Sequence, residues 1–201
     1  MIKKVSLFLN GEKPSLTVDL AQSHSIYCVD GAYKHLQELK IIPDLLIGDF
    51  DSIESLPEDV KYIHTPNQNY TDFEKALKII EEHGFTHVDV FAANGLEQDH
   101  FLGNMSTALK YKNKLEIKFY DDRQSYYFIQ KKTKLTHVKG KIISLFPFPK
   151  AKKVKSTGLE YPLENLNLNM QKNKIGTRNK ALKDTVTIEF KKGTILLFIQ
   201  R

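Results

Sequence analysis

The chain has 201 residues, of which 41% are hydrophobic, and a formal net charge of +6. It is long enough to bury a sizeable core in one large domain or two small ones. The single cysteine, Cys28, excludes an internal disulfide, and we expect it to be a small core residue in a protein of the reducing cytoplasm. The N-terminus becomes polar too early for a signal peptide. No apolar stretch approaches the ~18 residues of a membrane span, so we expect no membrane contact.

The charge is distributed unevenly along the chain. Residues 1–130 hold 13 Lys and Arg against 20 Asp and Glu, whereas residues 131–201 hold 17 against 4. The hydrophobic pattern changes in the same region, which predicts a domain boundary between residues 124 and 125. A basic half is compatible with nucleic-acid binding, with attraction of a polyphosphate, or with a solvated lysine surface. No nucleic-acid recognition motif accompanies it, so we predict no nucleic-acid partner.

Residues 1–124 alternate short apolar runs with helical patterns. A helix is predicted from Phe73, Ala76, Leu77 and Ile80, which share one face, with Thr71 or Asp72 as its N-cap and Gly84 as its stop. A second helix is predicted over residues 98–111. Strands are predicted at residues 5–9, 26–29, 45–47, 62–64, 88–92 and 115–120. This alternation indicates an α/β domain with a mostly parallel, Rossmann-like sheet and helices on both faces.

From about Ser125 the hydrophobic period changes to two. Val186, Ile188 and Phe190 alternate, and residues 191–194 are predicted to form a hairpin turn before a buried strand over residues 195–199. Further strands are predicted at residues 142–146 and 159–163. Because no helix-length pattern remains, residues 125–201 are predicted to form an all-β sandwich or half-barrel.

Two carboxylates follow the apolar run of residues 45–47. The run stops at Gly48, and Asp49 and Asp51 come directly after it, at the end of a strand where ligands bind in open α/β sheets. Neighbouring carboxylates repel unless a cation lies between them, and hard oxygen ligands suit Mg²⁺. With Asp72, which also follows a strand, they are the predicted metal-binding and catalytic residues. The alternative is a polar turn with capping aspartates, and an N-cap for Asp72.

Two further segments resemble ligand-binding turns. Asp30, Gly31 and Ala32 end a strand and open a helix, where a glycine allows close backbone approach and a helix N-terminus favours an anion. An ordinary βα turn is the alternative. Asp99 and His100 begin the second helix, and a structural histidine is the alternative there.

The order of these motifs is similar to that of thiamine pyrophosphokinases. The matching segments are Val29-Asp30-Gly31-Ala32, Ile42-Pro43-Asp44, Gly48-Asp49-Phe50-Asp51-Ser52-Ile53, Thr71-Asp72-Phe73-Glu74-Lys75-Ala76, Asp99-His100 with Gly103-Asn104, Ser156-Thr157-Gly158-Leu159-Glu160-Tyr161-Pro162-Leu163 and Gly176-Thr177-Arg178-Asn179. The resemblance spans nearly the whole chain and implies the same two-domain architecture. It implies Mg²⁺-dependent transfer of pyrophosphate from ATP to thiamine, with AMP as the second product.

The resemblance also implies roles for individual residues. It points to the same three aspartates for the metal and leaves the general base unassigned. On the ATP side it places Asp30, Gly31, Gln68, Thr71, Asp99, His100 and Asn104, and on the thiamine side Ser156, Gly158, Tyr161, Arg178 and Asn179. Tyr161 would stack on the pyrimidine ring. The family is homodimeric, with a thiamine pocket between the nucleotide domain of one subunit and the β-domain of the other.

The chain departs from the family pattern at several positions. An aspartate expected before Thr71 is missing, since residues 67–70 carry the amides of Asn67 and Asn69 but no carboxylate. Glu97 replaces an arginine, and Arg178 replaces a small hydroxyl residue. These departures favour a second hypothesis, a non-catalytic nucleotide- or thiamine-phosphate-binding protein. A basic nucleic-acid-binding module is the third, and an aspartyl-phosphate phosphatase would need an electrophilic lysine that no motif supplies.

Overall fold

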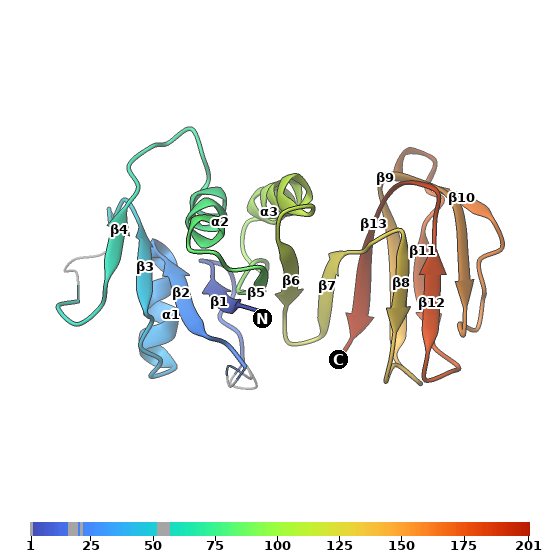
Figure 1. The fold of residues 1–201 in the computed structure, drawn as a ribbon, viewed down its shortest axis with the longest axis horizontal. Coiled ribbons are helices and arrows are strands. Elements are labelled where there is room, and N and C mark those ends of the chain that lie inside the picture. Colours follow the sequence, from blue (N-terminus) through green and yellow to red (C-terminus); the bar gives the residue numbers. More distant parts are fainter. Residues whose placement is uncertain (1, 16–19, 21, 52–56) are drawn as a thin grey trace. The chain divides into compact units, whose positions relative to one another are not determined.

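The computed structural model describes residues 2–15, 20, 22–51 and 57–201 (Figure 1). The chain divides into two compact units, Met1–Asp122 and Arg123–Arg201. Each has its own set of strands and its own buried core, so the two are described separately. Within the described residues, no helix is long and apolar enough to cross a membrane.

Unit 1 is built on a parallel sheet. Its described strands are β1 (Lys4–Phe8), β2 (Ser25–Val29), β3 (Leu45–Gly48), β4 (Tyr62–His64), β5 (His87–Phe91) and β6 (Glu116–Tyr120), in the spatial order β4-β3-β2-β1-β5-β6. Every pairing between these neighbours is parallel. The strands agree with the six predicted ones to within one residue at either end. Buried parallel strands such as β3 consist of continuous apolar runs, which the sequence identifies well, whereas β4 at the edge of the sheet is largely exposed.

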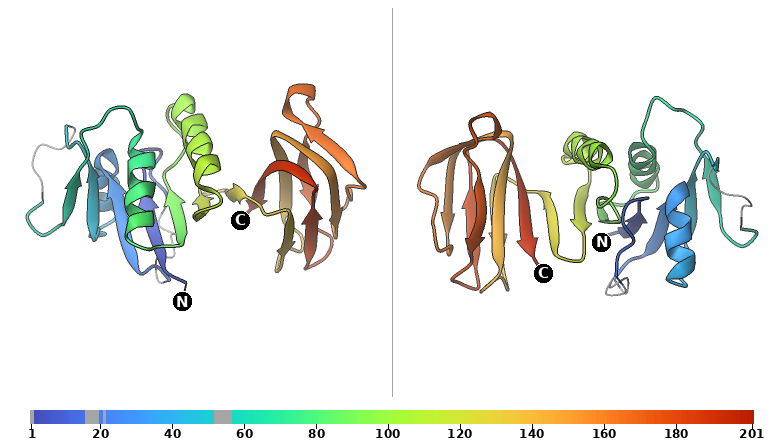
Figure 2. Two further views of the ribbon diagram at one scale, coloured as in Figure 1. Left: turned by 45° about the horizontal axis from the view of Figure 1, so that its top comes forward. Right: turned by 180° about the vertical axis from the view of Figure 1, so that it is seen from behind.

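Helices cover the sheet of unit 1 on opposite sides. A 3₁₀ turn, η1 (Asp30–Ala32), runs directly into α1 (Tyr33–Glu38), which lies on one face, while α2 (Asp72–Glu82) and α3 (Gln98–Tyr111) lie on the other (Figures 1 and 2). The predicted apolar face of α2 is buried. Thr71 caps its N-terminus, because the Thr71 hydroxyl accepts a hydrogen bond from the Glu74 amide at 3.2 Å.

Unit 2 is described as strands joined by loops and one 3₁₀ turn, η2 (Met170–Lys172). The strands are β7 (Gln124–Phe128), β8 (Lys132–Leu135), β9 (Ile142–Thr157), β10 (Leu166–Asn169), β11 (Gly176–Lys180), β12 (Val186–Glu189) and β13 (Lys192–Gln200). The 16-residue strand β9 organises the unit, since it pairs antiparallel with β10, β11, β12 and β13. Residues such as Ile143, Val154, Ile188 and Leu197 pack between these strands as a buried core.

Two sequence predictions for unit 2 are wrong, and a third is correct in position but too short. The strand predicted at residues 142–146 continues to Thr157, because β9 passes through Pro147 and Pro149 while its pairing with β13 shifts register. Residues 191–194 do not form a hairpin, because β12 pairs with β8 and β9 whereas β13 pairs with β7 and β9. Residues 159–163 form a loop and not a strand, since Leu159 makes one isolated bridge to Ala181.

Candidate functional site

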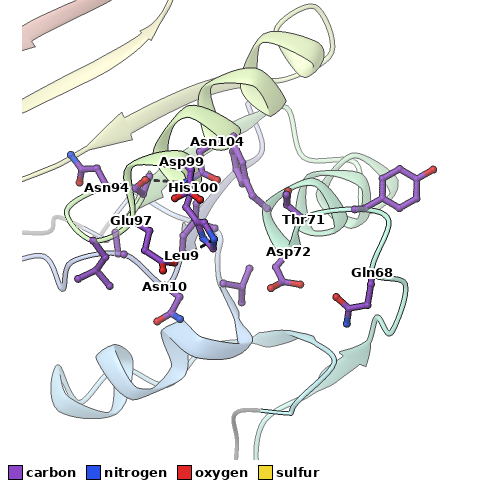
Figure 3. A pocket seen from close by; sticks show the side chains of 18 of the residues that line it. Leu9, Asn10, Gln68, Thr71, Asp72, Asn94, Glu97, Asp99, His100 and Asn104 are labelled. Carbon is purple, nitrogen blue, oxygen red and sulfur yellow. Dashed lines mark hydrogen bonds and ion pairs between the residues drawn. The ribbon is translucent and has the colours of Figure 1, made fainter.

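A cavity of about 770 Å³ opens at the carboxyl ends of the central strands of unit 1 (Figure 3). Its walls include Leu9 and Asn10 after β1, Val29 at the end of β2, and Ala92 after β5. Strands β2, β3 and β4 follow one another on one side of β1, and the chain then returns to place β5 and β6 on the other side. In open α/β sheets this reversal of strand order creates the crevice where ligands bind.

Most of the residues predicted on the ATP side line this cavity. They are Gln68, Thr71, Asp99, His100 and Asn104, together with the predicted metal ligand Asp72. The N-termini of α2 and α3 supply four of these six, and Asn104 lies further along α3. Figure 3 shows Asp72 and His100 extending into the same space. Two of the residues also fix the walls. Thr71 caps α2, and the Asn104 amide donates to the Ala93 carbonyl at 3.0 Å.

Three aspartates gather beside the end of β3. Carboxylate oxygens of Asp30, Asp49 and Asp51 lie within 4.8 Å of one another. Gly48 makes this possible, because a Cβ built on it would lie 2.5 Å from the Asp30 Cβ. Asp72, predicted as the third ligand, is not in this group, whereas Asp30, predicted on the ATP side, is. Ser52 and Ile53, from the same sequence motif, lie outside the described residues.

The electrostatics of these carboxylates indicate a shared negative field. The pKa of Asp51 is raised, first by the charge of Asp49 and then by partial desolvation and by the charges of Asp30 and Asp72. Asp72 therefore belongs to the same field although it lies outside the tight group. The pKa of Asp49 is lowered, chiefly because the Gln68 amide donates to its Oδ2 at 2.5 Å. Three close carboxylates, whose mutual repulsion raises the pKa of Asp51, fit a hard divalent cation.

Lys75 is a charged residue that sequence reasoning missed. Its side chain is only 7% exposed, and its ammonium lies 3.0 Å from the Asp72 Oδ1, one turn away on α2. Its charge also contributes to lowering the pKa of Asp49, after the larger effect of Gln68. The missed signal was its position, because Lys75 falls on the buried face of α2 next to Ala76. A lysine on a buried face needs a charged partner.

Asn10 is a second residue that the sequence did not single out, and it lies against Gly31. Asn10 lines the cavity, and a Cβ added to Gly31 would lie 2.2 Å from the Asn10 amide nitrogen. The close approach of Asn10 therefore gives a structural reason for glycine at position 31, and the approach of a ligand to this backbone stays a prediction. The signal available was Asn10 following the first strand, the same position that Asp30 and Asp49 occupy after theirs.

Of the departures from the family pattern, those at residues 67–70 and 97 lie at or near the cavity of unit 1, whereas Arg178 lies in unit 2. Glu97 lines it, and its carboxylate is 3.4 Å from the His100 Nε2, with both side chains exposed. Asn67 forms a local turn by accepting from the Asn69 amide at 2.9 Å. Among the described residues that line the cavity there is no lysine or arginine. Any polyanion bound here therefore needs countercharge from a cation or from elsewhere.

The residues predicted on the thiamine side lie in unit 2. Asn179 on β11 hydrogen-bonds the backbone of Tyr161, and Ser156 on β9 hydrogen-bonds that of Leu163. Gly158 precedes this loop with a positive φ of 82°. Arg178 is exposed, and its amide donates to the Ser144 hydroxyl at 3.0 Å. The structure thus groups Ser156, Tyr161 and Asn179 through the backbone of one loop.

Two family models of known proteins match this chain, one in each unit. The family model for the thiamin pyrophosphokinase catalytic domain matches residues 18–119, just over half of the chain. The model for the vitamin B1 binding domain of the same enzymes matches residues 128–195.

The chain belongs to the thiamin pyrophosphokinase family. It is 25% identical to thiamine pyrophosphokinase of Bacillus subtilis, over 98% of each chain. It is 26% identical to thiamin pyrophosphokinase 1 of Caenorhabditis elegans, over 96% of this chain and 87% of the relative. A crystal structure of the Bacillus subtilis thiamine pyrophosphokinase superposes with a TM-score of 0.82 at 26% identity, covering 98% of both chains. Members of the family thus share the fold of this chain over both units.

Proposed function

We propose that this protein transfers pyrophosphate from ATP to the hydroxyl of thiamine, giving thiamine diphosphate and AMP. The observation that carries the proposal is the match of the catalytic-domain model to residues 18–119. These residues include the carboxylate cluster and most of the cavity lining of unit 1, to which Leu9, Asn10 and Gly11 also contribute. Unit 1 would act as a Rossmann-like nucleotide domain. Unit 2, as a β-sandwich or half-barrel, would contribute the thiamine pocket.

In the reaction, the acceptor oxygen attacks the β-phosphorus of ATP. A new oxygen–phosphorus bond forms, the bond from the β-phosphorus to the oxygen of the α-phosphate breaks, and AMP leaves. The proton of the acceptor hydroxyl is released to solvent. Such a transfer depends mainly on alignment and on neutralising charge on the phosphoryl oxygens. Gln68, Thr71, Asp99, His100 and Asn104 would bind and orient the nucleotide in the cavity. The N-termini of α2 and α3 would favour its negative charge.

Asp49, Asp51 and Asp72 would hold Mg²⁺, with Asp30 as a further ligand. The donor set fits, because it consists of carboxylate oxygens whose mutual repulsion raises the pKa of Asp51. When bound, Mg²⁺ would neutralise charge on the polyphosphate. Gln68 would hold Asp49 in position through the amide hydrogen bond to its Oδ2. The positive charge of Mg²⁺ matters the more because the described residues of the cavity wall include no lysine or arginine.

The remaining expectations rest on the resemblance. We propose that the protein is a homodimer, in which the nucleotide domain of one subunit and the β-domain of its partner form each thiamine pocket. Tyr161, Ser156, Gly158, Arg178 and Asn179 would serve the thiamine side. The single buried cysteine supports a reducing cytoplasm as the compartment.

The decisive experiment is to incubate purified protein with thiamine, ATP and Mg²⁺ and to separate the products by chromatography. We expect equal amounts of thiamine diphosphate and AMP. Stoichiometric ADP would indicate a simple kinase. Tight binding of ATP or thiamine in calorimetry without any product would favour the non-catalytic alternative, for which the glutamate at position 97 is the motivating observation.

A further inference from the structure

The loop of residues 159–163, called here the Tyr161 loop, combines an exposed aromatic ring with a buried support. Tyr161 is 69% exposed, whereas Leu159 is 5% exposed and anchors the beginning of the loop in the core of unit 2. A large aromatic ring in solvent gains nothing from packing. Ordering the loop that carries it costs conformational entropy. A loop of this kind therefore needs a source of order other than the ring.

The order comes from two buried polar side chains. Asn179 is 9% exposed, and its carboxamide bonds both backbone groups of Tyr161: Oδ1 accepts from the Tyr161 amide at 3.1 Å, and Nδ2 donates to the Tyr161 carbonyl at 2.6 Å. Ser156 is 6% exposed, and its hydroxyl accepts from the Leu163 amide at 2.8 Å. The carboxamide thus replaces the peptide group that a neighbouring strand would offer.

Backbone bonds close the loop on both sides of these contacts. The Ser156 amide donates to the Leu163 carbonyl at 2.9 Å, and the Glu160 amide donates to the Lys180 carbonyl at 2.8 Å. At the entrance, a Cβ on Gly158 would lie 2.5 Å from the Thr185 carbonyl oxygen. The backbone of the loop is therefore specified at several points while the phenol ring of Tyr161 is left accessible.

We propose that Asn179 and Ser156 are positioning residues that hold the Tyr161 loop as a preformed surface for the aromatic ring of the acceptor. They act through the backbone of the loop and not by contact with the acceptor. The occupant follows from chemistry: an exposed aromatic face binds a flat, cationic heteroaromatic ring by stacking and cation–π attraction. The loop also lies inside residues 128–195, which match the vitamin B1 binding domain. The identity of the acceptor rests on the proposed function.

The chain contains no tryptophan, so Tyr161→Trp introduces a single fluorescent reporter into the loop. In this background, Asn179→Ala removes both carboxamide bonds. We expect a lower fluorescence anisotropy of the indole and about a tenfold rise in the thiamine Kd, measured by quenching without ATP, a factor equivalent to about 1.4 kcal/mol. The KM for thiamine should rise in parallel, and the KM for ATP should not change.

Two further variants keep the test sharp. Asn179→Asp keeps one acceptor but loses the donor to the Tyr161 carbonyl, so its effect should be intermediate. Ser156→Ala leaves the backbone pairing with Leu163 intact and is the substitute if circular dichroism shows that Asn179→Ala does not fold. We expect it to lower the anisotropy and to raise the thiamine Kd by less than Asn179→Ala would. Asn169→Ala is the matched control, because Asn169 accepts from the Gln171 amide in another loop of the same unit. It should change neither anisotropy nor thiamine binding.

Two results would overturn the inference. A weaker thiamine affinity with unchanged anisotropy would mean that Asn179 contacts the acceptor itself. A lower anisotropy with unchanged thiamine affinity, or no binding of thiamine by the unsubstituted protein, would mean that the loop is not its surface. Failure of the proposed function is distinguishable. A protein that binds thiamine as described but forms no thiamine diphosphate contradicts the enzymatic activity and leaves the positioning role standing.

Discussion

At the scale of single residues, the site is dominated by acidic side chains held close together against their own repulsion. Asp30 is buried, and Asp49 and Asp51 are brought to it by the contact between Gly48 and the Asp30 side chain. Such a cluster lowers the stability of the fold unless a cation occupies it. The same charges that would bind a metal therefore oppose folding in its absence.

The first prediction concerns Asp51→Asn. The pKa of Asp51 is raised in the folded protein, so its charged form opposes folding and its protonated form does not. The folded protein therefore becomes more stable as the pH falls through the folded pKa of Asp51 and the carboxylate is protonated. Asparagine is neutral at every pH and removes the repulsion permanently. We expect a higher Tm than that of the unsubstituted protein at pH 7 without metal. We expect kcat to fall by about a hundredfold or more, beyond the range seen for partners of metal ligands.

Calorimetric melting scans with and without Mg²⁺, together with the product assay, check this prediction. Asp59→Asn, at an exposed turn position, is the control and should leave Tm and kcat unchanged. A lower Tm in Asp51→Asn, or full activity with an unchanged fold, would contradict the assignment of Asp51 to the carboxylate cluster.

A second prediction tests Lys75. Lys75→Met keeps the long aliphatic stem that packs in α2 but removes the ammonium beside Asp72. Because Asp72 loses the cation that holds it, we expect turnover to fall and the Mg²⁺ concentration for half-maximal rate to shift, each by about tenfold. Lys78→Met on the same helix is the matched control, since Lys78 is 71% exposed. Equal behaviour of the two variants in a Mg²⁺ titration would show that Lys75 has only a packing role.

At the scale of elements, the helix that carries Thr71 and Asp72 depends on one hydroxyl. Thr71→Ala leaves the Glu74 amide without its capping acceptor, and such a loss costs about 1 kcal/mol. We expect urea denaturation to show this decrease in the free energy of unfolding. The KM for ATP should rise, because α2 borders the cavity. Thr71→Ser retains the cap and should behave like the unsubstituted protein. A loss of similar size in Thr71→Ser would place the effect in the methyl group instead.

Elements differ in how far the sequence determines them. Most strands of unit 1 were predicted well because they are largely buried and mainly apolar, although β4 at the edge of the sheet is largely exposed. β9 was not, because its prolines and lysines break the period-two pattern, and its length follows from pairing with four other strands. The alternation of Leu159, Tyr161 and Leu163 misled in the opposite direction, since Asn179 and Ser156 supply the hydrogen bonds that a partner strand would make.

The same distinction applies to the site. Carboxylates and amides at strand ends could be predicted, because the carboxyl edge of a parallel sheet collects whatever follows each strand. The exchange of Asp72 for Asp30 in the tight group could not, because it depends on the close approach of Gly48 to Asp30 across two neighbouring strands. Lys75 was hidden in the helix pattern, where a charged residue on a buried face is easily taken for solvent exposed.

At the scale of the whole molecule, the opposite charges of the two halves and the proposed dimer lead to a complementation test. Asp51→Asn disables the carboxylate cluster in unit 1, and Tyr161→Ala removes the ring from the loop in unit 2. If each site is formed by unit 1 of one subunit and unit 2 of its partner, a mixed dimer of the two inactive variants contains one intact site. With random exchange of subunits, about half of the dimers are mixed and each has one of its two sites intact. We therefore expect activity to recover to at most about a quarter of the unsubstituted level.

The measurement needs proof of subunit exchange, which mass spectrometry of differently labelled variants provides. Mixing either variant with itself is the control and should restore nothing. An absence of recovery despite complete exchange would show that each site is completed within one chain.

Cys28 offers a measure of motion in the sheet that requires no engineering. It lies on β2, in register with Phe8 and Leu46 of the neighbouring strands, and has no exposed surface. The pKa of its thiol is raised, mainly by burial and to a smaller extent by the charge of Asp30. Its side chain projects from one face of the sheet, so a reagent such as dithionitrobenzoate can modify it only after the packing over that face has opened. The labelling rate therefore reports how often the centre of unit 1 opens. Since Asp30 follows two residues later, MgATP bound at the strand ends should slow this rate, whereas labelling in the mixing time would show that the sheet opens freely.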